Sequence, residues 1–598
     1  MSYIFRDAPI GQFIRLITGN RVLQYPEEKP GFELPEPWLQ TLKADPTDFI
    51  FNPPKYRTDH LTSGSETAIS TTSGANDLEE IELETRTPTA NRPQSPPDTI
   101  PEVEQRYELG RRREQEKRLS LPIVPQTTKD GAILVDWYYT DDPENPQNWS
   151  KLRQHMVSAI ICLYTAVVYT SSAIYITSNE GIMKEFGVNT EQASLGLALY
   201  VLGYGIGPML FSPLSEVPVI GRNPIYIWTM FIFVIVSIPA AMPTNYAGLM
   251  VLRFLQGFFG SPCLGNGGAT LGDMYDIMTL PYAMIAYVGA AYCGPALGPL
   301  LSGFSVPAMG WRWSLLEILW AAAPILVVMI LFLPETSADN LLLRRAARLR
   351  KITGISRFMS QSEIDQANLD KKAVFWEALI KPIEITFKDP AIFFVQMYTS
   401  VIYGIYYSFF EVFPLVYPVY YGMDYGHVGL IFLCVLVAFA IGATVYSAYM
   451  YFYMNPRIAR LDFPSNETRL VPALAAAFGP CVGLFIFAWT ARPEIHWIVP
   501  TIGITTYSST VFVVTQCIFV YLPLSYPRYA ASLFASNDFF RSAFAFASVL
   551  YAQPLFGSLG VARGTSLLGG LSFIGVVGIW ALYFYGGKLR AMSKFATS

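Results

Sequence analysis

Five ionisable side chains stand within long apolar stretches of the sequence, where a charge is costly and usually marks a function. Asp538 and Arg541 are three residues apart, so on a helix they share a face, and we expect them to neutralise each other in a structural or gating role. Glu411 has no basic residue near it in the sequence, and Glu317 is a similar candidate. Burial of a lone carboxyl favours its protonated form, so both residues could transfer protons or attract cationic groups.

Arg253 is the fifth such residue and stands in the run Leu252-Arg253-Phe254-Leu255-Gln256-Gly257. An unpaired guanidinium inside a membrane costs at least about 3 kcal/mol, so an acceptor or a water-filled path must hold it. The alternative is an arginine near the outer end of a helix, which extends its charge into water.

Small residues recur four apart in residues 289–299, at Ala290, Gly294 and Gly298, and Pro295 and Pro299 follow two of them. Small residues at this spacing let another helix approach closely, and the prolines remove backbone donors and bend the helix. Packing of small residues without a further role is the alternative.

Aromatic and amide side chains near these groups could line a cavity for a small molecule. Six candidates are Gln256, Tyr292, Tyr403, Tyr407, Phe410 and Tyr507. Aromatic side chains in apolar helices usually serve packing, which is the alternative for each of them.

Apolar segments carry all of these residues, because 52% of the 598 residues are apolar and only 15% are charged, with a mean hydropathy of +0.32. This composition excludes a soluble enzyme, and a net charge of −4 gives no basic surface for nucleic acid. A helix needs about 20 apolar residues to cross a bilayer. Twelve stretches are long enough: 156–177, 193–213, 225–241, 246–270, 281–304, 313–333, 391–414, 428–452, 471–490, 497–521, 530–555 and 566–585. We predict an all-α integral membrane protein with twelve transmembrane helices in two pseudo-symmetric six-helix bundles.

Polar segments divide the chain into parts. We expect a cytoplasmic N-terminal region at 1–154 that is largely disordered from 57 to 126, and helix bundles at 155–333 and 391–587. Between the bundles lies a cytoplasmic central loop at 334–390, and a short cytoplasmic tail follows at 588–598. Basic residues concentrate on one side, ten of them in the central loop, which places both termini in the cytosol.

A helical pattern of apolar residues precedes the polar part of the N-terminal region. Ile10, Phe13, Ile14 and Ile17 recur at helical spacing. A short helix on the inner membrane surface has this pattern, and so has a helix that packs into a small soluble subdomain. The sequence leaves both interpretations open.

Other chemistry has little support in the sequence. The six cysteines lie in apolar runs without metal-ligand spacing, the four histidines form no cluster, and no glycine-rich phosphate loop is present. We therefore expect no metal, no cofactor and no ATP-driven transport. A membrane-embedded enzyme would need a polar catalytic set that these residues do not provide.

Three segments resemble motifs of the major facilitator superfamily. Residues 212–224 resemble its cytoplasmic-loop signature, with Glu216 at the acidic position and Gly221-Arg222 as the glycine–basic pair, which implies a charge lock at the closed cytoplasmic side. Two extra residues before Gly221 depart from that signature. Arg253 resembles the intramembrane arginine that the family associates with proton transfer. Residues 289–299 resemble the antiporter signature of drug exporters, with Ala290 in place of a glycine.

Longer segments resemble the fungal drug:proton antiporters with twelve spans, specifically the fluconazole/benomyl-resistance branch. They are 141–149, 311–313, 333–336, 409–414 and 534–542. The resemblance implies a monomeric, proton-coupled efflux antiporter in the lipid bilayer of the plasma membrane. Its substrates would be hydrophobic or cationic small molecules such as azole- or benomyl-type xenobiotics. Export of an endogenous metabolite, a toxin or polyamines by the same mechanism stays open, as does a transporter-derived sensor.

Overall fold

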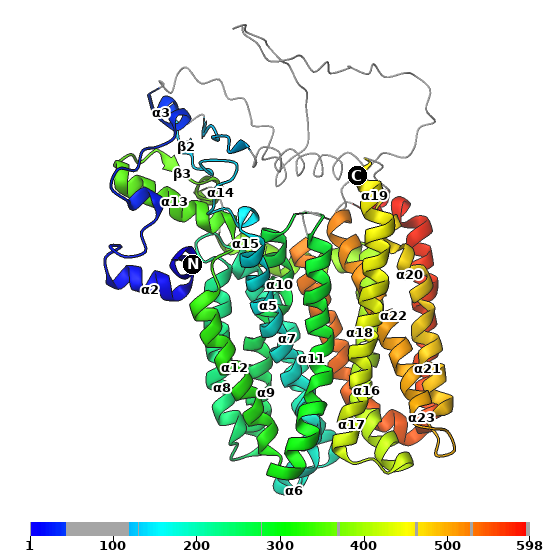
Figure 1. Ribbon diagram of the computed structural model, residues 1–598. Coiled ribbons are helices and arrows are strands. Elements are labelled where there is room, and N and C mark those ends of the chain that lie inside the picture. Colours follow the sequence, from blue (N-terminus) through cyan, green and yellow to red (C-terminus); the bar gives the residue numbers. More distant parts are fainter. Residues whose placement is uncertain are drawn as a thin grey trace, which may run out of the picture.

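A computed structural model describes residues 2–43, 119–128, 131–276, 278–367, 371–460, 465–526 and 530–593. Long helices form a bundle, and a subdomain of short helices and strands lies on its upper end (Figure 1). The segment for which we predicted disorder, 57–126, lies outside the described residues except for 119–126. In that last part, the Ile123 carbonyl accepts a hydrogen bond from Trp38 Nε1 at 2.9 Å.

The first group of spanning helices contains α5 (Lys151–Ala173), α7 (Thr190–Glu216), α8 (Arg222–Ala241), α9 (Tyr246–Gly260) with α10 (Pro262–Met274), α11 (Leu280–Met309) and α12 (Arg312–Phe332). Two short helices, η3 (Ile176–Ser178) and α6 (Asn179–Phe186), connect α5 to α7. Polar caps begin the apolar helices: the Ser150 side chain accepts from Arg153 N, and Asn189 forms a capping box with Gln192. Pro262 cannot donate a hydrogen bond, so one crossing is divided between α9 and α10.

The second group contains α16 (Pro390–Tyr421), α17 (Tyr425–Ile431) with α18 (Leu433–Tyr449), the π-helix η4 (Met450–Met454), α19 (Asn455–Ala459), η5 (Asn466–Leu470), α20 (Val471–Ala476) with α21 (Phe478–Thr490), α22 (Ile498–Ser525) and α23 (Ala530–Met592). In the described residues, eleven helical segments are long and apolar enough to cross a membrane. The last, which runs to Met592, bends at Gly560, where a φ of 77° suits glycine, and therefore provides two crossings. The count agrees with the twelve apolar stretches of the sequence.

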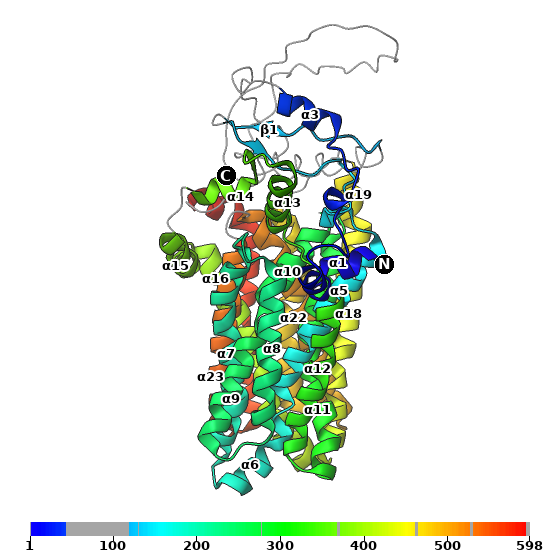
Figure 2. The same cartoon turned by 90° about the vertical axis from the view of Figure 1, so that its left-hand side faces the viewer.

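The two groups lie side by side, the first coloured cyan to green and the second mostly yellow to red (Figure 1). They meet where α7 packs against α23 and where α11 packs against α17 and α18. Figure 2 shows the helices running parallel to the long axis of the bundle. Large apolar side chains such as Trp228, Trp320 and Ile574 are exposed on the outside, as expected of a surface that faces lipid.

The subdomain on the upper end combines residues from before the first crossing with residues of the central segment. The former supply α1 (Ser2–Asp7), α2 (Pro9–Ile17), η1 (Pro26–Glu28), α3 (Glu36–Lys43), β1 (Gln126–Thr127) and β2 (Ile133–Leu134). The latter supply α13 (Ala338–Thr353), β3 (Phe358–Met359) and α14 (Gln361–Ala367), whereas α15 (Lys371–Lys388) packs against α16, α23 and α7 of the bundle. The strands form one sheet in the order β1-β2-β3, in which β2 pairs antiparallel with β1 and parallel with β3. Trp38, Val135 and Phe358 lie in its apolar core.

A buried ionic cluster holds the two parts of this subdomain together. Arg345 of α13 is 1% exposed and lies 2.7 Å from Asp142, 3.1 Å from Glu144 and 3.4 Å from Glu27. Burial alone would raise the pKa of Asp142, but the Arg345 guanidinium and two backbone N–H donors hold it below its ordinary value. The segment before the first crossing is therefore fixed to the segment that follows the sixth.

Candidate functional site between the helix groups

Arg253 lies at the middle of α9, and its side chain is completely buried. Its guanidinium donates to four oxygens: the carbonyls of Ser171, Ser172 and Gly196 at 3.0–3.1 Å and Oε1 of Gln256 at 3.2 Å. The two serines stand in the last turn of α5, where carbonyls lack partners within the helix and carry the negative end of its dipole. Arg253 therefore stabilises the lower end of α5.

Aromatic rings complete the surroundings of Arg253. The guanidinium carbon lies 4.4 Å from the ring centre of Tyr200 and 4.9 Å from that of Tyr175, which is cation–π geometry. Gln256 lies behind it and donates to Ser237 Oγ at 2.9 Å. In the described part of the chain, Arg253 is thus held by dipoles and ring faces rather than by a carboxylate, and Gln256 belongs to this support.

A chain of hydroxyl groups leads from Arg253 to the boundary between the two helix groups. Ser172 Oγ lies 3.1 Å from Tyr407 Oη of α16. Tyr204 Oη of α7 donates to Tyr407 Oη at 2.9 Å and lies 2.6 Å from Tyr403 Oη. Both groups contribute hydroxyls, so any movement of one group against the other must rearrange these hydrogen bonds.

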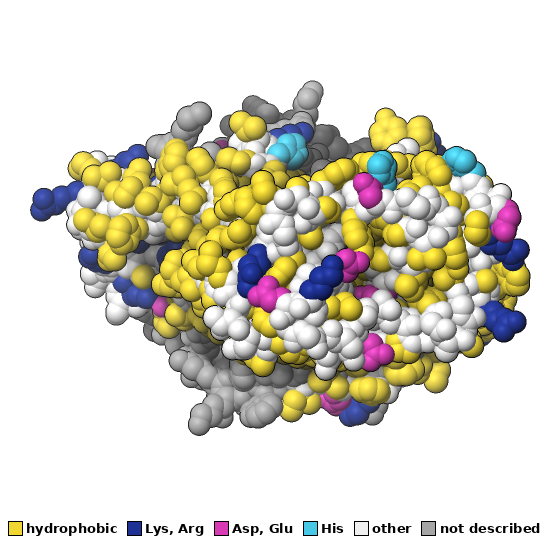
Figure 3. All heavy atoms as spheres, turned by 90° about the horizontal axis from the view of Figure 1, so that it is seen from below, with side chains coloured by type: hydrophobic (Ala, Val, Ile, Leu, Met, Phe, Trp, Pro, Cys, Tyr) yellow, Lys and Arg dark blue, Asp and Glu magenta, His cyan; other side chains and the backbone are white. Residues whose placement is uncertain are grey.

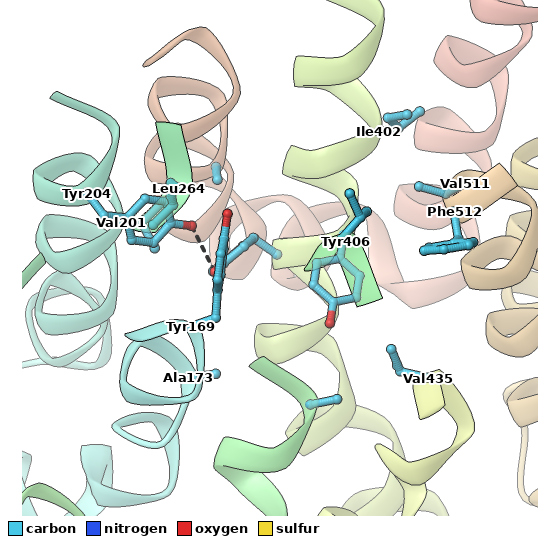
Figure 4. Close-up of a cluster of buried hydrophobic side chains, with 14 of the residues drawn as sticks. Tyr169, Ala173, Val201, Tyr204, Leu264, Ile402, Tyr406, Val435, Val511 and Phe512 are labelled. Carbon is cyan, nitrogen blue, oxygen red and sulfur yellow. Dashed lines mark hydrogen bonds between the residues drawn. The ribbon is translucent and has the colours of Figure 1, made fainter. Parts of the chain in front are cut away.

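An ion pair continues this chain in the second group. Arg541 Nη2 lies 2.6 Å from Asp538 Oδ1, one turn away on α23. Arg541 also donates to Tyr169 Oη of the first group at 3.2 Å, and its guanidinium lies 4.4 Å from the ring centre of Tyr403. Figure 4 shows Tyr169 on the side of the first group and Tyr406 of α16 across the boundary. The positive charge of Arg541 therefore lies at the contact of the two groups.

Glu411 lies in the lower half of α16 and is 3% exposed. Its Oε2 accepts from Gln553 Nε2 of α23 at 3.0 Å, its Oε1 has no hydrogen-bond partner among the described residues, and Ser194 of α7 lies nearby. The carboxyl therefore lies beside both helix groups and is hydrogen-bonded within its own. Glu317 is half-buried beside Ser305, on a helix that packs against α5, α8 and α11 of its own group. The structure does not bring the two glutamates together.

The small residues of α11 lie against α5. A Cβ at Gly294 would lie 2.6 Å from Tyr169 Cβ, and one at Gly298 would lie 2.5 Å from the backbone N of Ile174. Thr170 Oγ1 donates to the Gly294 carbonyl at 2.8 Å. The two helix backbones therefore touch, and a larger residue has no room at either glycine.

Other residues of this motif face different neighbours. Pro295 and Pro299 stand inside α11 and are buried, whereas Ala290 is half-buried. The Pro299 carbonyl lies against Gly429 of α17, where an added Cβ would approach it to 2.6 Å. The motif thus contributes to the contact between the two groups as well as to packing inside the first.

The remaining aromatic candidates separate into two positions. Tyr292 of α11 stacks on Tyr406 of α16, with ring centroids 5.1 Å apart, and donates to the Ser508 carbonyl at 3.0 Å, so it bridges the groups. Phe410 packs against Tyr406 with ring centroids 5.6 Å apart and belongs to the same boundary. Tyr507 lies inside the second group, where it donates to a backbone carbonyl of α16.

Charged residues at the upper end tie several helices together. Arg222 Nε lies 2.5 Å from Asp273 Oδ2 of α10. The backbone N–H groups of Arg222 and the next residue donate to the carboxylate of Glu335 at 3.1 Å, which caps the N-terminus of α8. Gly221 has a φ of 79°, and a Cβ there would lie 2.5 Å from Glu335 Oε2. Glu216 is exposed beside them and forms no ion pair in the described part of the chain.

Sequence reasoning missed four residues of these two sites: Tyr169, Tyr204, Asp273 and Glu335. Asp273 could have been found, because an acidic residue at the end of an apolar run carries the same signal as Asp538. The tyrosines gave no such signal, since many tyrosines of this chain occur in apolar runs. Among the described residues, no group of three or more His, Cys, Asp or Glu side chains could hold a metal ion.

Comparisons with known proteins agree with this arrangement. The family model described as Major Facilitator Superfamily matches residues 161–549. The MFS-type transporter pyvG of Aspergillus violaceofuscus is 41% identical over 597 residues, covering all of both chains. Fluconazole resistance protein 1 of Saccharomyces cerevisiae is 36% identical over 475 residues, which cover 79% of this chain and 86% of that protein.

Among solved structures, the proton:xylose symporter XylE has a similar fold. It superposes with a TM-score of 0.53 at 12% sequence identity, covering 74% of this chain and all of the symporter. Together with the family match, this confirms the predicted fold class, an all-helical membrane protein of two helix bundles.

Proposed function

The chain belongs to the major facilitator superfamily, and from this premise we propose that it exports hydrophobic or cationic small molecules across the plasma membrane in exchange for protons. It is a multi-pass membrane transporter and not an enzyme. One observation carries the proposal: a chain of hydroxyls and charges, from Ser172 through Tyr407, Tyr204 and Tyr403 to Arg541, crosses the boundary between the helix groups.

Hydroxyl contacts suit a boundary that must open and close. A net hydrogen bond contributes only about 0.5–1.5 kcal/mol, because water or a ligand replaces the lost partner. Each tyrosine can therefore exchange its partner without leaving a buried group unsatisfied. When the groups separate on one side, Tyr204 and Tyr403 would become free to contact a bound molecule.

The chemistry of this boundary supports the proposed substrate class. Tyr292, Tyr403 and Tyr406 provide ring faces that bind apolar and aromatic molecules. The same faces attract cations, as Tyr403 already does with Arg541. A cationic substrate could replace the Arg541 guanidinium against the Tyr403 ring. Arg541 would then keep its ion pair with Asp538.

Glu411 is the proposed carrier of the coupling proton. It accepts a hydrogen bond from Gln553 of its own group and lies near Ser194 of the other, so separation of the lower ends would move Ser194 away and admit water. From an acidic exterior the hydrated carboxylate would take up a proton, and the neutral carboxyl could be buried again at little cost. Arg253 acts as a positioning residue, because it holds the end of α5 that carries Ser172.

The upper end of the bundle is proposed to face the cytosol. Arg222 and the arginines of α13, among them Arg345 and Arg348, lie at this end. Basic residues concentrate on the cytosolic side of membrane proteins, which favours this orientation. Substrate would then enter from the upper end and leave at the lower end. The name of the yeast relative refers to fluconazole resistance, so azoles are the first compounds to test.

The decisive experiment uses the full-length protein in inside-out vesicles from a host that lacks its own drug pumps. A fluorescent azole or another drug to which the chain confers resistance is supplied outside, and a pH gradient, acidic inside, is imposed without ATP. Antiport predicts uptake of the drug into the vesicles that stops when an ionophore collapses the gradient. Uptake that ignores the gradient would refute proton coupling.

Glu411→Gln and Glu317→Gln form a matched pair for the proton carrier. Glu411→Gln keeps the side-chain shape but cannot ionise, so it should still bind drug and lose gradient-driven accumulation, whereas Glu317→Gln should retain it. Full coupling in Glu411→Gln would assign the proton to another carboxyl, with Asp538 the next to test.

A further inference from the structure

The exposed residues of α2 are all large and apolar. Phe13 is 58% exposed, Ile14 37%, Leu16 78% and Ile17 68%. The other residues of this helix are buried or half-buried. Such a face would be unfavourable in water and needs an apolar partner.

The inward face of α2 has the opposite character. Gly11 is buried, and a Cβ there would collide with the backbone of α1. Arg15 is also buried, with Nη2 2.7 Å from Glu28 Oε1 and its guanidinium 4.5 Å from the ring centre of Tyr25. A helix of a soluble subdomain would bury Phe13 and Ile17 and expose its arginine. The reversal excludes packing of the apolar stripe into the subdomain.

The position of α2 points to the membrane as its partner. The helices α1 and α2 pack against α12, and the rings of Phe5 and Phe332 lie 5.3 Å apart at the last residue of that spanning helix. Only 28% of the most apolar segment of α12 is buried, so this side of the bundle faces lipid. Figure 1 shows α2 projecting sideways from the upper end, across the direction of the spanning helices.

Seen from the lower end, the part of the molecule that projects on the side of α2 presents mainly apolar side chains (Figure 3). This is the side that a surrounding bilayer would meet. It continues the lipid-facing surface of α12, on which Trp320 and Val327 are exposed.

We propose that α2 lies in the plane of the membrane, with Phe13, Ile14, Leu16 and Ile17 inserted among the acyl chains of the leaflet at the upper end. The occupant of the apolar face is lipid hydrocarbon, and no particular headgroup is needed. Through the Arg15–Glu28 ion pair, the inserted helix would fix the subdomain on the upper end of the bundle relative to the membrane surface. The proposal depends on the membrane position of the helices and not on the transported substrate.

The test uses the full-length protein in lipid nanodiscs, with its six cysteines replaced by serine and one new cysteine carrying a nitroxide label. Leu16→Cys reports on α2, and Gln40→Cys is the control, because Gln40 is an exposed polar residue on α3 of the same subdomain. Collision of the label with oxygen, which concentrates in lipid, is compared with collision with a water-soluble nickel chelate. Nanodiscs of pure phosphatidylcholine are compared with nanodiscs that also contain phosphatidylserine.

Insertion predicts that the Leu16→Cys label collides more often with oxygen than with nickel in both lipids, whereas the Gln40→Cys label shows the reverse ratio. A Leu16→Cys ratio equal to that of Gln40→Cys would overturn the proposal. A preference for oxygen that occurs only with phosphatidylserine would also overturn it, because binding would then depend on headgroup charge. Efflux by both labelled proteins confirms that they are folded.

Discussion

Replacement of Gly294 tests how closely α5 and α11 must approach. A Cβ on Gly294 would lie 2.6 Å from Tyr169 Cβ, about 1 Å inside the roughly 3.5–4.0 Å at which carbon atoms attract each other. Overpacking of this kind costs about 1–3 kcal/mol, whereas alanine gains about 1 kcal/mol over glycine in a helix. Gly294→Ala should therefore destabilise the protein by up to about 2 kcal/mol. Gly294→Leu should force the helices apart.

The displacement should also have a functional effect, because Tyr169 accepts the hydrogen bond of Arg541 across the boundary. The control is Gly570 of α23, where an added Cβ meets nothing within 4 Å. Thermal unfolding of the purified proteins and drug efflux from cells are measured for Ala and Leu at both positions. We expect a lower Tm for Gly294→Ala than for Gly570→Ala, and inserted but inactive protein for Gly294→Leu. Equal Tm values together with normal efflux by Gly294→Leu would refute the argument.

Other variants test the remaining contacts. Arg253→Ala should fold but lose efflux, because Ser171 and Ser172 lose their donor, and circular dichroism separates this result from unfolding. Arg345→Ala leaves the buried Asp142 carboxylate without its arginine at a cost of about 3–5 kcal/mol, whereas Glu27 and Glu144 keep Arg348, so a protease should cut the upper subdomain faster while the spans stay intact. Folding lowers the pKa of Asp142, so the stability that this carboxylate provides is complete above about pH 4 and is lost as the pH falls through its pKa in the folded protein. Acid unfolding monitored by Trp fluorescence measures this loss. Deletion of residues 57–117 should leave drug resistance unchanged, since their Ser-, Thr- and Pro-rich composition cannot bury enough apolar surface to build a core.

The spanning helices could be predicted because each apolar run is a local property of the sequence. The ends of the helices were harder to predict. Helix α16 continues past Pro414 to Tyr421, because Pro414 and Pro418 are accommodated inside a buried helix. The subdomain was not predictable either. Its sheet pairs Ile133 with Phe358, and two-residue strands leave no periodic pattern in a sequence.

In the candidate site, too, contacts within one helix could be predicted, whereas contacts between distant segments could not. The spacing of Asp538 and Arg541 was enough to predict their pairing, because one helix turn joins them. The hydrogen bond between Tyr204 and Tyr407 joins two helices about 200 residues apart, and no spacing rule relates them. The apolar run around Arg253 was enough to predict that its guanidinium needs a hydrogen-bond acceptor. Which groups accept depends on where α5 ends, and this could not be predicted.

The pairing of β2 with β3 also constrains the order of events during synthesis. The ribosome completes Ile133 and Leu134 more than 200 residues before Phe358 and Met359, and all six helices of the first group are made in between. At about 5–20 residues per second, the first half of the subdomain waits on the order of 10–45 s for its partner strand. During that interval Trp38 and Glu27 lack the α13 side chains that later cover them. Closure of the subdomain can therefore occur only after the first bundle has been synthesised, so a folded subdomain marks a chain whose first six spanning segments have all been made.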